Sequence, residues 1–163
     1  MKKTILIISL LIVSFVNAQV FIGSGDNKFQ VGANFQNTAS GINASYDFGL
    51  GENMSVGFST TYALSIDEDL DADFTDRFDI KARFNANLGN VVNIDENFDI
   101  YPGLNISLKN FGGHLGMRYF FTDGFGIYTE LNTPFAKYKT DTLTPAQKLH
   151  NQFTINLGAA FNL

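Results

Sequence analysis

Apolar and polar residues alternate along this chain with a period of two, in one segment after another. In the clearest segment, residues 77–88, every second residue is apolar and the residues between are charged or amides. A strand separates these two sets onto opposite faces, whereas a helix would mix them around its axis. The alternation therefore predicts a strand with one apolar and one polar face.

Seven further segments alternate less perfectly. Together the eight expected strands cover residues 28–36, 42–49, 54–62, 77–88, 98–108, 114–121, 125–135 and 153–162. Strands of roughly ten residues have the length that a tilted strand needs to cross a bilayer. An even number of strands also places both ends of the array on one side, as in single-chain bacterial barrels. We expect an all-β protein, an eight-stranded antiparallel up-and-down transmembrane β-barrel.

The first 18 residues differ from the rest. They contain Lys2 and Lys3, then an apolar run, then the small-residue pattern Val16-Asn17-Ala18. This is the pattern of a cleavable signal peptide, and the apolar run is shorter than the about 20 residues of a membrane-spanning helix. We therefore divide the chain into a signal peptide, residues 1–18, and an outer-membrane β-barrel, residues 19–163.

Composition excludes several kinds of chemistry. The chain has no cysteine, which excludes a lipoprotein attachment site, disulfides, thiol catalysis and cysteine-bound metals. The formal net charge is −5, and removing the signal peptide makes the chain more acidic because it removes two lysines and no acidic residue. Nucleic-acid binding needs a basic face, so we expect no nucleic-acid partner. We also expect no cofactor.

The connections between the expected strands are unequal. Residues 51–53 and 122–124 are tight polar turns, whereas residues 65–76 and 136–150 form long loops. Transmembrane barrels have short turns in the periplasm and longer loops outside. Two connections fit this less well, because residues 89–97 are long for a periplasmic turn and residues 109–112 are short for an outer loop.

Alternation alone does not distinguish a membrane barrel from a soluble lipocalin-like barrel, which keeps its apolar face inside. A membrane barrel turns its apolar face outward. The apolar faces here are nearly free of charge, and phenylalanines gather where they meet the expected periplasmic interface: Phe29, Phe48, Phe98, Phe121, Phe125 and Phe161. We favour the outward apolar face, and a soluble periplasmic ligand-binding barrel is the alternative.

The polar faces carry charges of both signs in near balance. A closed interior can hold such charges only if they pair, because an isolated buried charge is very costly. We therefore expect a structural charge network in the lumen, made of Lys28, Asp47, Arg77, Asp79, Lys81, Arg83, Asp99, His114, Arg118 and Glu130.

His114 is the one histidine expected to face the lumen, and a catalytic histidine needs a nucleophile or an acid within hydrogen-bond reach. Ser107 and Glu130 lie on the neighbouring expected strands, but no motif places the three together. We therefore assign no catalytic residue, and expect His114 to be hydrogen-bonded in the lumen. His150, at the end of a long loop, is expected to be exposed.

The acidic loop offers a weak candidate metal site at Asp67, Asp69, Asp71 and Asp73. Carboxylates of this kind suit a hard cation such as calcium. The loop lacks the central glycine and the terminal glutamate of an EF-hand, so we favour a solvated acidic loop without a metal.

The last eight residues read N-L-G-A-A-F-N-L, which places Asn156, Gly158, Phe161 and Leu163 at fixed spacing. This resembles the C-terminal insertion signal of outer-membrane barrel precursors, with Leu163 where an aromatic residue is commoner. Together with the leader and the strand count, the chain resembles the small barrels of the OmpA transmembrane-domain and OmpX type, and its Phe- and Asn-rich, Trp-free strands resemble those of Bacteroidetes. The resemblance implies outer-membrane lipids and the barrel insertion machinery as partners, and a monomer.

An eight-stranded barrel has an interior just wide enough for side chains to fill. A wide diffusion pore is therefore not expected. The functional hypothesis is a non-enzymatic barrel that contributes to envelope integrity or displays its outer loops for interaction. The alternatives are a narrow channel for small polar solutes or ions, and the soluble lipocalin-like barrel.

Overall fold

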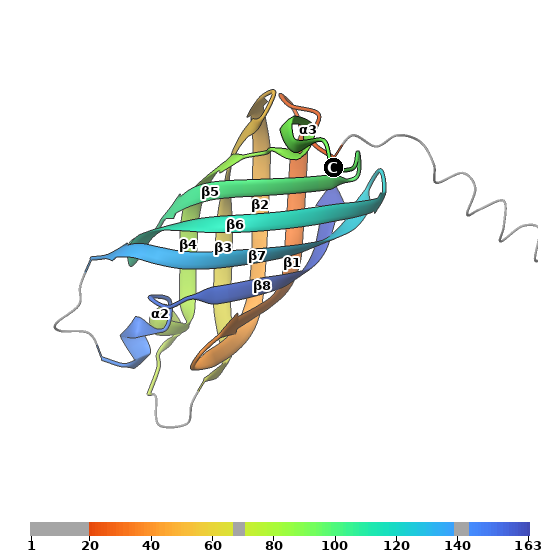
Figure 1. Cartoon of the computed structure of the whole chain (residues 1–163). Helices are drawn as coiled ribbons and strands as arrows, with labels where there is room; N and C mark the ends of the chain where they lie inside the picture. The colour runs from red at the N-terminus through yellow and green to blue at the C-terminus, as the bar shows by residue number, and fades with distance from the viewer. Residues whose placement is uncertain (1–19, 67–70, 139–143) are drawn as a thin grey trace, which may run out of the picture.

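The computed structural model describes residues 20–66, 71–138 and 144–163, and in it the chain forms a closed barrel of eight antiparallel strands (Figure 1). The strands follow one another around the ring in sequence order, and the last pairs with the first. The predicted all-β fold, an eight-stranded antiparallel up-and-down barrel, is confirmed. The expected signal peptide, residues 1–18, lies outside the described residues.

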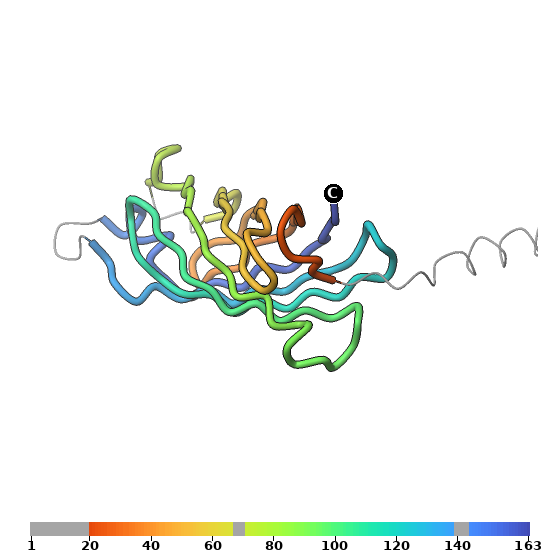
Figure 2. The backbone as a smooth tube through the Cα atoms, turned by 90° about the horizontal axis from the view of Figure 1, so that it is seen from above, coloured from red at the N-terminus to blue at the C-terminus, as the bar shows by residue number. Residues whose placement is uncertain are grey.

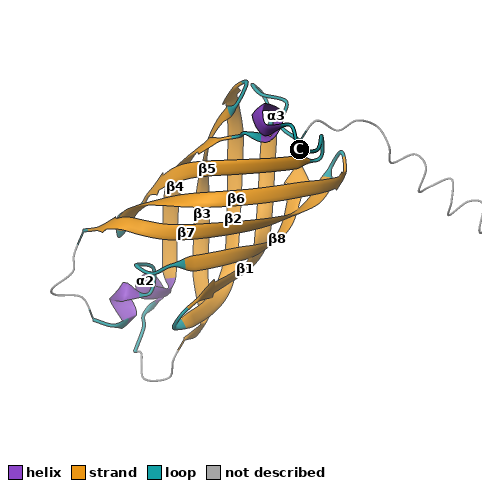
Figure 3. Ribbon diagram, in the orientation of Figure 1, coloured by secondary structure: helices purple, strands orange, loops and turns teal. Residues whose placement is uncertain are grey.

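The strands are β1 (Asn27–Gln36), β2 (Ala39–Gly51), β3 (Met54–Ile66), β4 (Phe78–Ala86), β5 (Phe98–Ile106), β6 (Asn110–Thr122), β7 (Phe125–Lys137) and β8 (Thr154–Asn162). Within the described residues, three short helical segments lie in connections: α2 (Phe74–Arg77), α3 (Gly89–Val92) and the 3-10 turn η1 (Ala146–Lys148). Figure 3 shows α2 and α3 at opposite ends of the barrel. No helix in the described part of the chain is long and apolar enough to cross a membrane.

We call the end with the β2–β3 and β6–β7 turns the turn end, and the opposite end the loop end. The long β4–β5 connection, which carries α3, lies at the turn end, and residues 107–109 form a short turn at the loop end. β6 begins at Asn110, whereas the alternation predicts a start at residue 114. The alternation misses the first residues of β6 because Gly112 and Gly113 interrupt the apolar–polar pattern.

The apolar faces of the strands point outward and the polar faces point into the barrel. The outward side chains of Phe58, Ile80 and Leu157 are each more than half exposed. At the alternating positions, polar side chains such as Gln30 and Asn85 are fully buried. This is the arrangement expected of a membrane barrel, and the reverse of a lipocalin-like barrel.

Aromatic side chains form a row around the turn end. The ring centroids of Phe29 and Phe161 lie 6.1 Å apart, those of Phe161 and Phe125 5.6 Å, and those of Phe125 and Phe121 6.3 Å. The row therefore crosses β1, β8, β7 and β6. At the loop end, Phe74 lies 5.6 Å from both Tyr62 and Phe78. Aromatic residues thus flank the apolar wall at both ends.

The seam between β1 and β8 depends on two facing glycines. Gly32 and Gly158 are register partners across this seam. A Cβ atom on Gly32 would lie 2.7 Å from the Cα atom of Gly158, and one on Gly158 would lie 2.8 Å from the carbonyl carbon of Val31. Any side chain at either position would collide with backbone, so the strands approach here more closely than other residues allow.

We expect Gly158→Leu to destabilise the barrel by at least about 1–3 kcal/mol, the usual cost of overpacking, because the new side chain meets the backbone of β1. Urea unfolding in detergent micelles measures the change. Ala159→Leu is the matched control, since Ala159 is the next residue and points outward. Equal unfolding midpoints for the two variants would contradict the role of the glycine seam.

Candidate functional site

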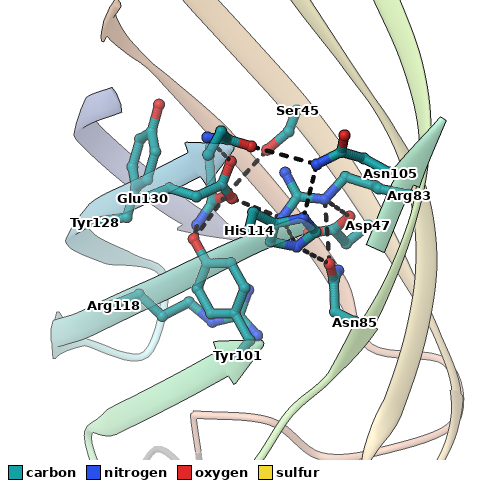
Figure 4. Close-up of polar contacts among 12 residues, drawn as sticks. Ser45, Asp47, Arg83, Asn85, Tyr101, Asn105, His114, Arg118, Tyr128 and Glu130 are labelled. Atoms are coloured by element: carbon teal, nitrogen blue, oxygen red, sulfur yellow. Dashed lines mark hydrogen bonds and ion pairs between the residues drawn. The ribbon is translucent and has the colours of Figure 1, made fainter. Parts of the chain in front are cut away.

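The middle of the barrel interior is filled by a buried ion-pair cluster centred on Arg83 (Figure 4). Arg83, on β4, places Nη2 2.7 Å from Oε2 of Glu130 on β7 and Nε 3.2 Å from Oδ1 of Asp47 on β2. All three side chains are buried. One guanidinium therefore joins two carboxylates across the inside of the barrel, between strands that are not neighbours in the sheet.

His114, on β6, lies beside this cluster with both ring nitrogens occupied. Its Nε2 is 2.7 Å from Oδ1 of Asn85, and its Nδ1 is 3.2 Å from Nδ2 of Asn105. A neutral ring that carries its proton on Nε2 donates to Asn85 and accepts from Asn105. The hydroxyl of Ser107 instead accepts hydrogen bonds from the backbone N–H groups of Lys109 and Asn110. The structure therefore does not bring Ser107 and His114 into a nucleophile–base pair.

A second ion pair lies nearer the turn end. Nη2 of Arg118 donates to Oδ2 of Asp99 at 2.7 Å and to Oδ1 of Asn87 at 2.8 Å. The guanidinium lies 4.7 Å from the ring centre of Tyr101, within cation–π distance. The Tyr101 ring also lies 5.8 Å from the guanidinium of Arg83, so it separates the two arginines.

The sequence makes room for these long side chains by placing glycine on the facing strands. A Cβ atom on Gly116 would overlap the ring of Tyr101, and one on Gly103 would overlap the ring of His114. Tyr101 then reaches across the interior, where its hydroxyl accepts a hydrogen bond of 2.9 Å from Nε2 of Gln30 on β1. Inward glycines and long inward side chains together fill the barrel.

The turn end is closed by residues that precede the first strand. Val20 and Phe21 are buried, and Val20 packs with Phe120, Tyr128 and Ala160. Two hydrogen bonds fix this segment to the β4–β5 connection: Val20 N–H donates to the Glu96 carbonyl at 3.2 Å, and the Asn90 side-chain amide donates to the Phe21 carbonyl at 3.0 Å.

Charged groups hold the same segment in place. Lys28 forms a buried ion pair with Asp26, and Oδ2 of Asp26 accepts a hydrogen bond of 2.8 Å from the N–H of Ile22. The Lys28 ammonium also lies 5.9 Å from the ring centre of Phe21 and 5.6 Å from that of Phe120. The period-two alternation does not predict this closure, although the apolar run Val20-Phe21-Ile22, which does not alternate, is visible in the sequence.

The loop end is closed by the connection that leads into β8. Leu149 is buried and packs against Ala39 and Ala63 in the barrel mouth. The side-chain amide of Asn110 donates to the His150 carbonyl and to Oδ1 of Asn151, both at 2.9 Å. We call residues 144–153 the outer cap.

Two residues at this end differ from the expectation. His150, expected to be exposed, is 5% exposed, because the outer cap folds inward over the mouth. Arg77, expected in the lumen, is the last residue of α2, and its Nε donates to the Ala72 carbonyl at 3.2 Å. Strand β4 begins only at Phe78, so the helical turn carries Arg77 away from the interior.

Inward strand positions hold the remaining expected luminal residues: Lys28, Asp47, Asp79, Lys81, Arg83, Asp99, His114, Arg118 and Glu130. Lys81 lies in the half of the barrel near the loop end, where its Nζ is 3.8 Å from Oδ2 of Asp79 and 3.2 Å from Oδ1 of Asn110. Between it and the outer cap is a polar cavity of about 20 Å³, room for about one water, with Asn34, Asn43 and His150 among its lining residues.

The residues of the expected insertion signal take four different positions. Asn156 points inward and accepts a hydrogen bond of 2.6 Å from the Asn34 amide, and Gly158 forms the seam. Phe161 belongs to the aromatic row at the turn end. Leu163 is exposed at the end of the chain.

The acidic loop is only partly described. Asp67 and Asp69 lie outside the described residues, and Asp71 and Asp73 are exposed. The N–H of Asp73 donates to Oδ2 of Asp76 at 3.3 Å, within the turn that starts α2. Across residues 20–66, 71–138 and 144–163, no three or more His, Cys, Asp or Glu side chains are placed to hold a metal ion.

We expect Arg83→Ala to destabilise the barrel by about 3–5 kcal/mol, because it leaves the buried carboxylates of Asp47 and Glu130 without their partner. The measurement is urea unfolding of the protein in micelles. Arg77→Ala is the control, since Arg77 lies outside the interior, and should change stability by no more than about 0.5 kcal/mol. Similar losses in both variants would count against the cluster as a structural centre.

The outer cap should loosen at acid pH. The pKa of His150 is lowered from 6.5 to about 3, first by burial and then by the charges of Lys109 and Lys81, while hydrogen bonds with the backbone of Arg77 and Asp76 oppose the shift. Since the folded pKa lies below the unfolded one, the stability that neutral His150 provides is complete above pH 6.5 and is lost as pH falls towards 3.

Hydrogen exchange of the Leu149 and Asn151 amides, corrected for the intrinsic rate, should therefore show less protection at low pH than at neutral pH. These amides donate to the Ala146 and Lys148 carbonyls within the cap. His150→Gln removes the titrating ring and should remove the pH dependence. A pH dependence that survives in His150→Gln would assign the effect to another group.

Comparison with known proteins gives one family match. The model of the family of unknown function DUF6646 matches residues 11–163, which include every strand of the barrel. No curated protein matches the chain. On the strength of the family match, the chain belongs to the DUF6646 family.

Proposed function

We propose that this protein is a non-enzymatic outer-membrane barrel that conducts no solutes, stabilises the cell envelope and presents its outer cap to the exterior. The observation that carries the proposal is an apolar outer wall around an interior that the chain itself fills and closes at both ends. Buried ion pairs fill the middle, Val20 and Phe21 close the turn end, and Leu149 closes the loop end.

Insertion into a membrane is supported by the wall. An apolar surface of this extent is unfavourable in water, since each square ångström exposed costs about 25 cal/mol, and soluble monomers rarely expose large contiguous apolar patches. Rows of aromatic side chains flank the wall at both ends, as in the girdles of outer-membrane barrels. The leader pattern of residues 1–18 and the C-terminal pattern of residues 156–163 agree with export and insertion.

The proposed orientation places the turn end in the periplasm and the loop end outside. The tight β2–β3 and β6–β7 turns lie at one end, and the long connections with α2 and η1 lie at the other. The outer surface is held by specific contacts: Nζ of Lys109 donates to the Thr75 carbonyl at 2.8 Å and to the Phe78 carbonyl at 2.6 Å. A pre-organised surface of this kind loses little conformational entropy when it binds a partner.

The non-enzymatic part of the proposal is supported by the surroundings of His114. Its nitrogens contact the amides of Asn85 and Asn105, while Glu130 is engaged by Arg83. These contacts are typical of a structural polar network, in which most buried groups have a partner.

A narrow channel is the second candidate. Buried polar atoms without a hydrogen-bond partner occur along the interior of the described barrel: Oδ2 of Asp79, Oδ1 of Asn105 and Nε2 of His150 towards the loop end, both carboxylate oxygens of Asp47 in the middle, and Nε and Nη1 of Arg118 towards the turn end. Buried polar groups usually have a partner, so these atoms favour bound water in the interior. A channel would have to continue past Arg83 and past the closure at Val20, and the ion pairs and packing at both places oppose this.

The orientation can be tested with single cysteines, because the native chain has none. Leu108→Cys lies on the β5–β6 turn, where the native side chain is 94% exposed, and Asp123→Cys lies on an exposed turn at the other end. A membrane-impermeant maleimide should label only Leu108→Cys in intact cells and both variants after permeabilisation. The unboiled protein should migrate faster than the boiled protein in SDS gels.

Labelling of Asp123→Cys alone would reverse the orientation, and release of unlabelled protein with the soluble periplasm would overturn membrane insertion.

The purified native barrel should give no conductance steps above baseline in a planar bilayer. Regular steps would favour the channel over the closed barrel.

A further inference from the structure

The β4–β5 connection at the turn end carries an exposed apolar group that the barrel itself does not use. Val91 is 63% exposed, Val92 48% and Ile94 69%. We call these three side chains the α3 tip. They lie within residues 91–94, on and just after α3. The fourth residue of this stretch, Asn93, caps the end of the helix in the left-handed conformation, with φ 49°.

Specific hydrogen bonds hold this connection in place. The N–H groups of Val91 and Val92 donate to the Leu88 carbonyl at 3.0 and 2.8 Å, and the Phe98 N–H donates to the Asp95 carbonyl at 3.1 Å. The Asn90 amide, on the polar side of the turn, donates to the carbonyl of Phe21. The α3 tip is therefore the apolar side of an anchored turn whose polar side faces the closure of the barrel.

The α3 tip lies next to the outward apolar face of β5, because α3 starts beside this strand. The Leu88 N–H donates to the Ile100 carbonyl at 2.9 Å, and the Gly89 N–H donates to Oδ1 of Asp99 at 2.8 Å, so α3 starts directly beside β5. Ile100 belongs to the outward apolar face of β5. In the view from above, the connection between β4 and β5 stands out to the side of the barrel wall (Figure 2).

We propose that the α3 tip enters the acyl–headgroup boundary of the periplasmic leaflet and anchors the barrel laterally in phospholipid. This rests on the proposed membrane insertion. Lipid is favoured as the occupant because the α3 tip continues the apolar wall, whereas three side chains are far smaller than the roughly 800 Å² per partner of a standard protein interface. Aliphatic side chains on a short amphipathic segment at the membrane surface bind lipid in this way.

The neighbouring charges set the depth of this contact. Asp95 and Glu96 follow the α3 tip directly and are exposed. Charged side chains are costly in hydrocarbon, so these carboxylates keep the segment at the level of the headgroups. The α3 tip therefore lies shallower than the middle of the strands.

The test uses tryptophan fluorescence, because the chain has no tryptophan. Three single-tryptophan variants are placed in phosphatidylcholine vesicles that contain brominated lipids. Ile94→Trp reports on the α3 tip, Leu104→Trp on the outward face of β5, and Glu52→Trp on the exposed β2–β3 turn at the same end as α3. Each variant is first checked for heat-modifiable migration, so that only folded barrels are compared.

The expected result is blue-shifted emission from Ile94→Trp, with stronger quenching by lipids brominated near the headgroup than near the chain end. Leu104→Trp should be quenched by both lipids, and Glu52→Trp by aqueous acrylamide alone. Quenching of Leu104→Trp without lipid quenching of Ile94→Trp would overturn the anchor and leave the membrane barrel standing. Absence of lipid quenching in both variants would overturn membrane insertion as well.

Discussion

The ion pairs of Arg83 with Asp47 and Glu130 are the contacts on which the rest of the barrel depends. They join β4 to β2 and β7 through the interior, in addition to the hydrogen bonds between neighbouring strands. A register slip of one residue would turn these charges towards the outside and bring apolar side chains into the lumen. The buried pairs and the apolar wall therefore require the same register, and each strand satisfies both requirements together.

The closures at the two ends rest on different chemistry. At the turn end, Val20 and Phe21 are held by packing and by the ammonium of Lys28. At the loop end, hydrogen bonds from Asn110 and the packing of Leu149 hold the outer cap. With the middle filled by ion pairs, the barrel is closed at three successive levels. These three closures are the observations on which the proposal of a barrel that conducts no solutes rests.

The period-two pattern predicted the strand number, the strand order and the side that faces inward, because a strand repeats every two residues whatever its partners are. It was wrong at Arg77, where the alternation continues into a residue that belongs to a helical turn. It also missed the start of β6, because Gly112 and Gly113 are neither apolar nor polar markers. The closures by Val20 and Leu149 depend on partners far away in sequence. The apolar run Val20-Phe21-Ile22 marks an apolar segment before the first strand, but it does not contain the residues against which this segment packs. The pairing of Arg83 with Asp47 and Glu130 also depends on partners far away in sequence, since inward side chains meet across the barrel.

The ring has no edge strand, since β8 pairs with β1 along nine register pairs, as many as some of the sequence-adjacent strands make. The chain also enters β1 and leaves β8 at the same end, where the Leu163 N–H donates to the Asn27 carbonyl at 3.0 Å. A chain that started at the β5–β6 turn and joined these two ends would form the same eight pairings. The pairing of the eight strands in the closed barrel therefore does not depend on which strand comes last.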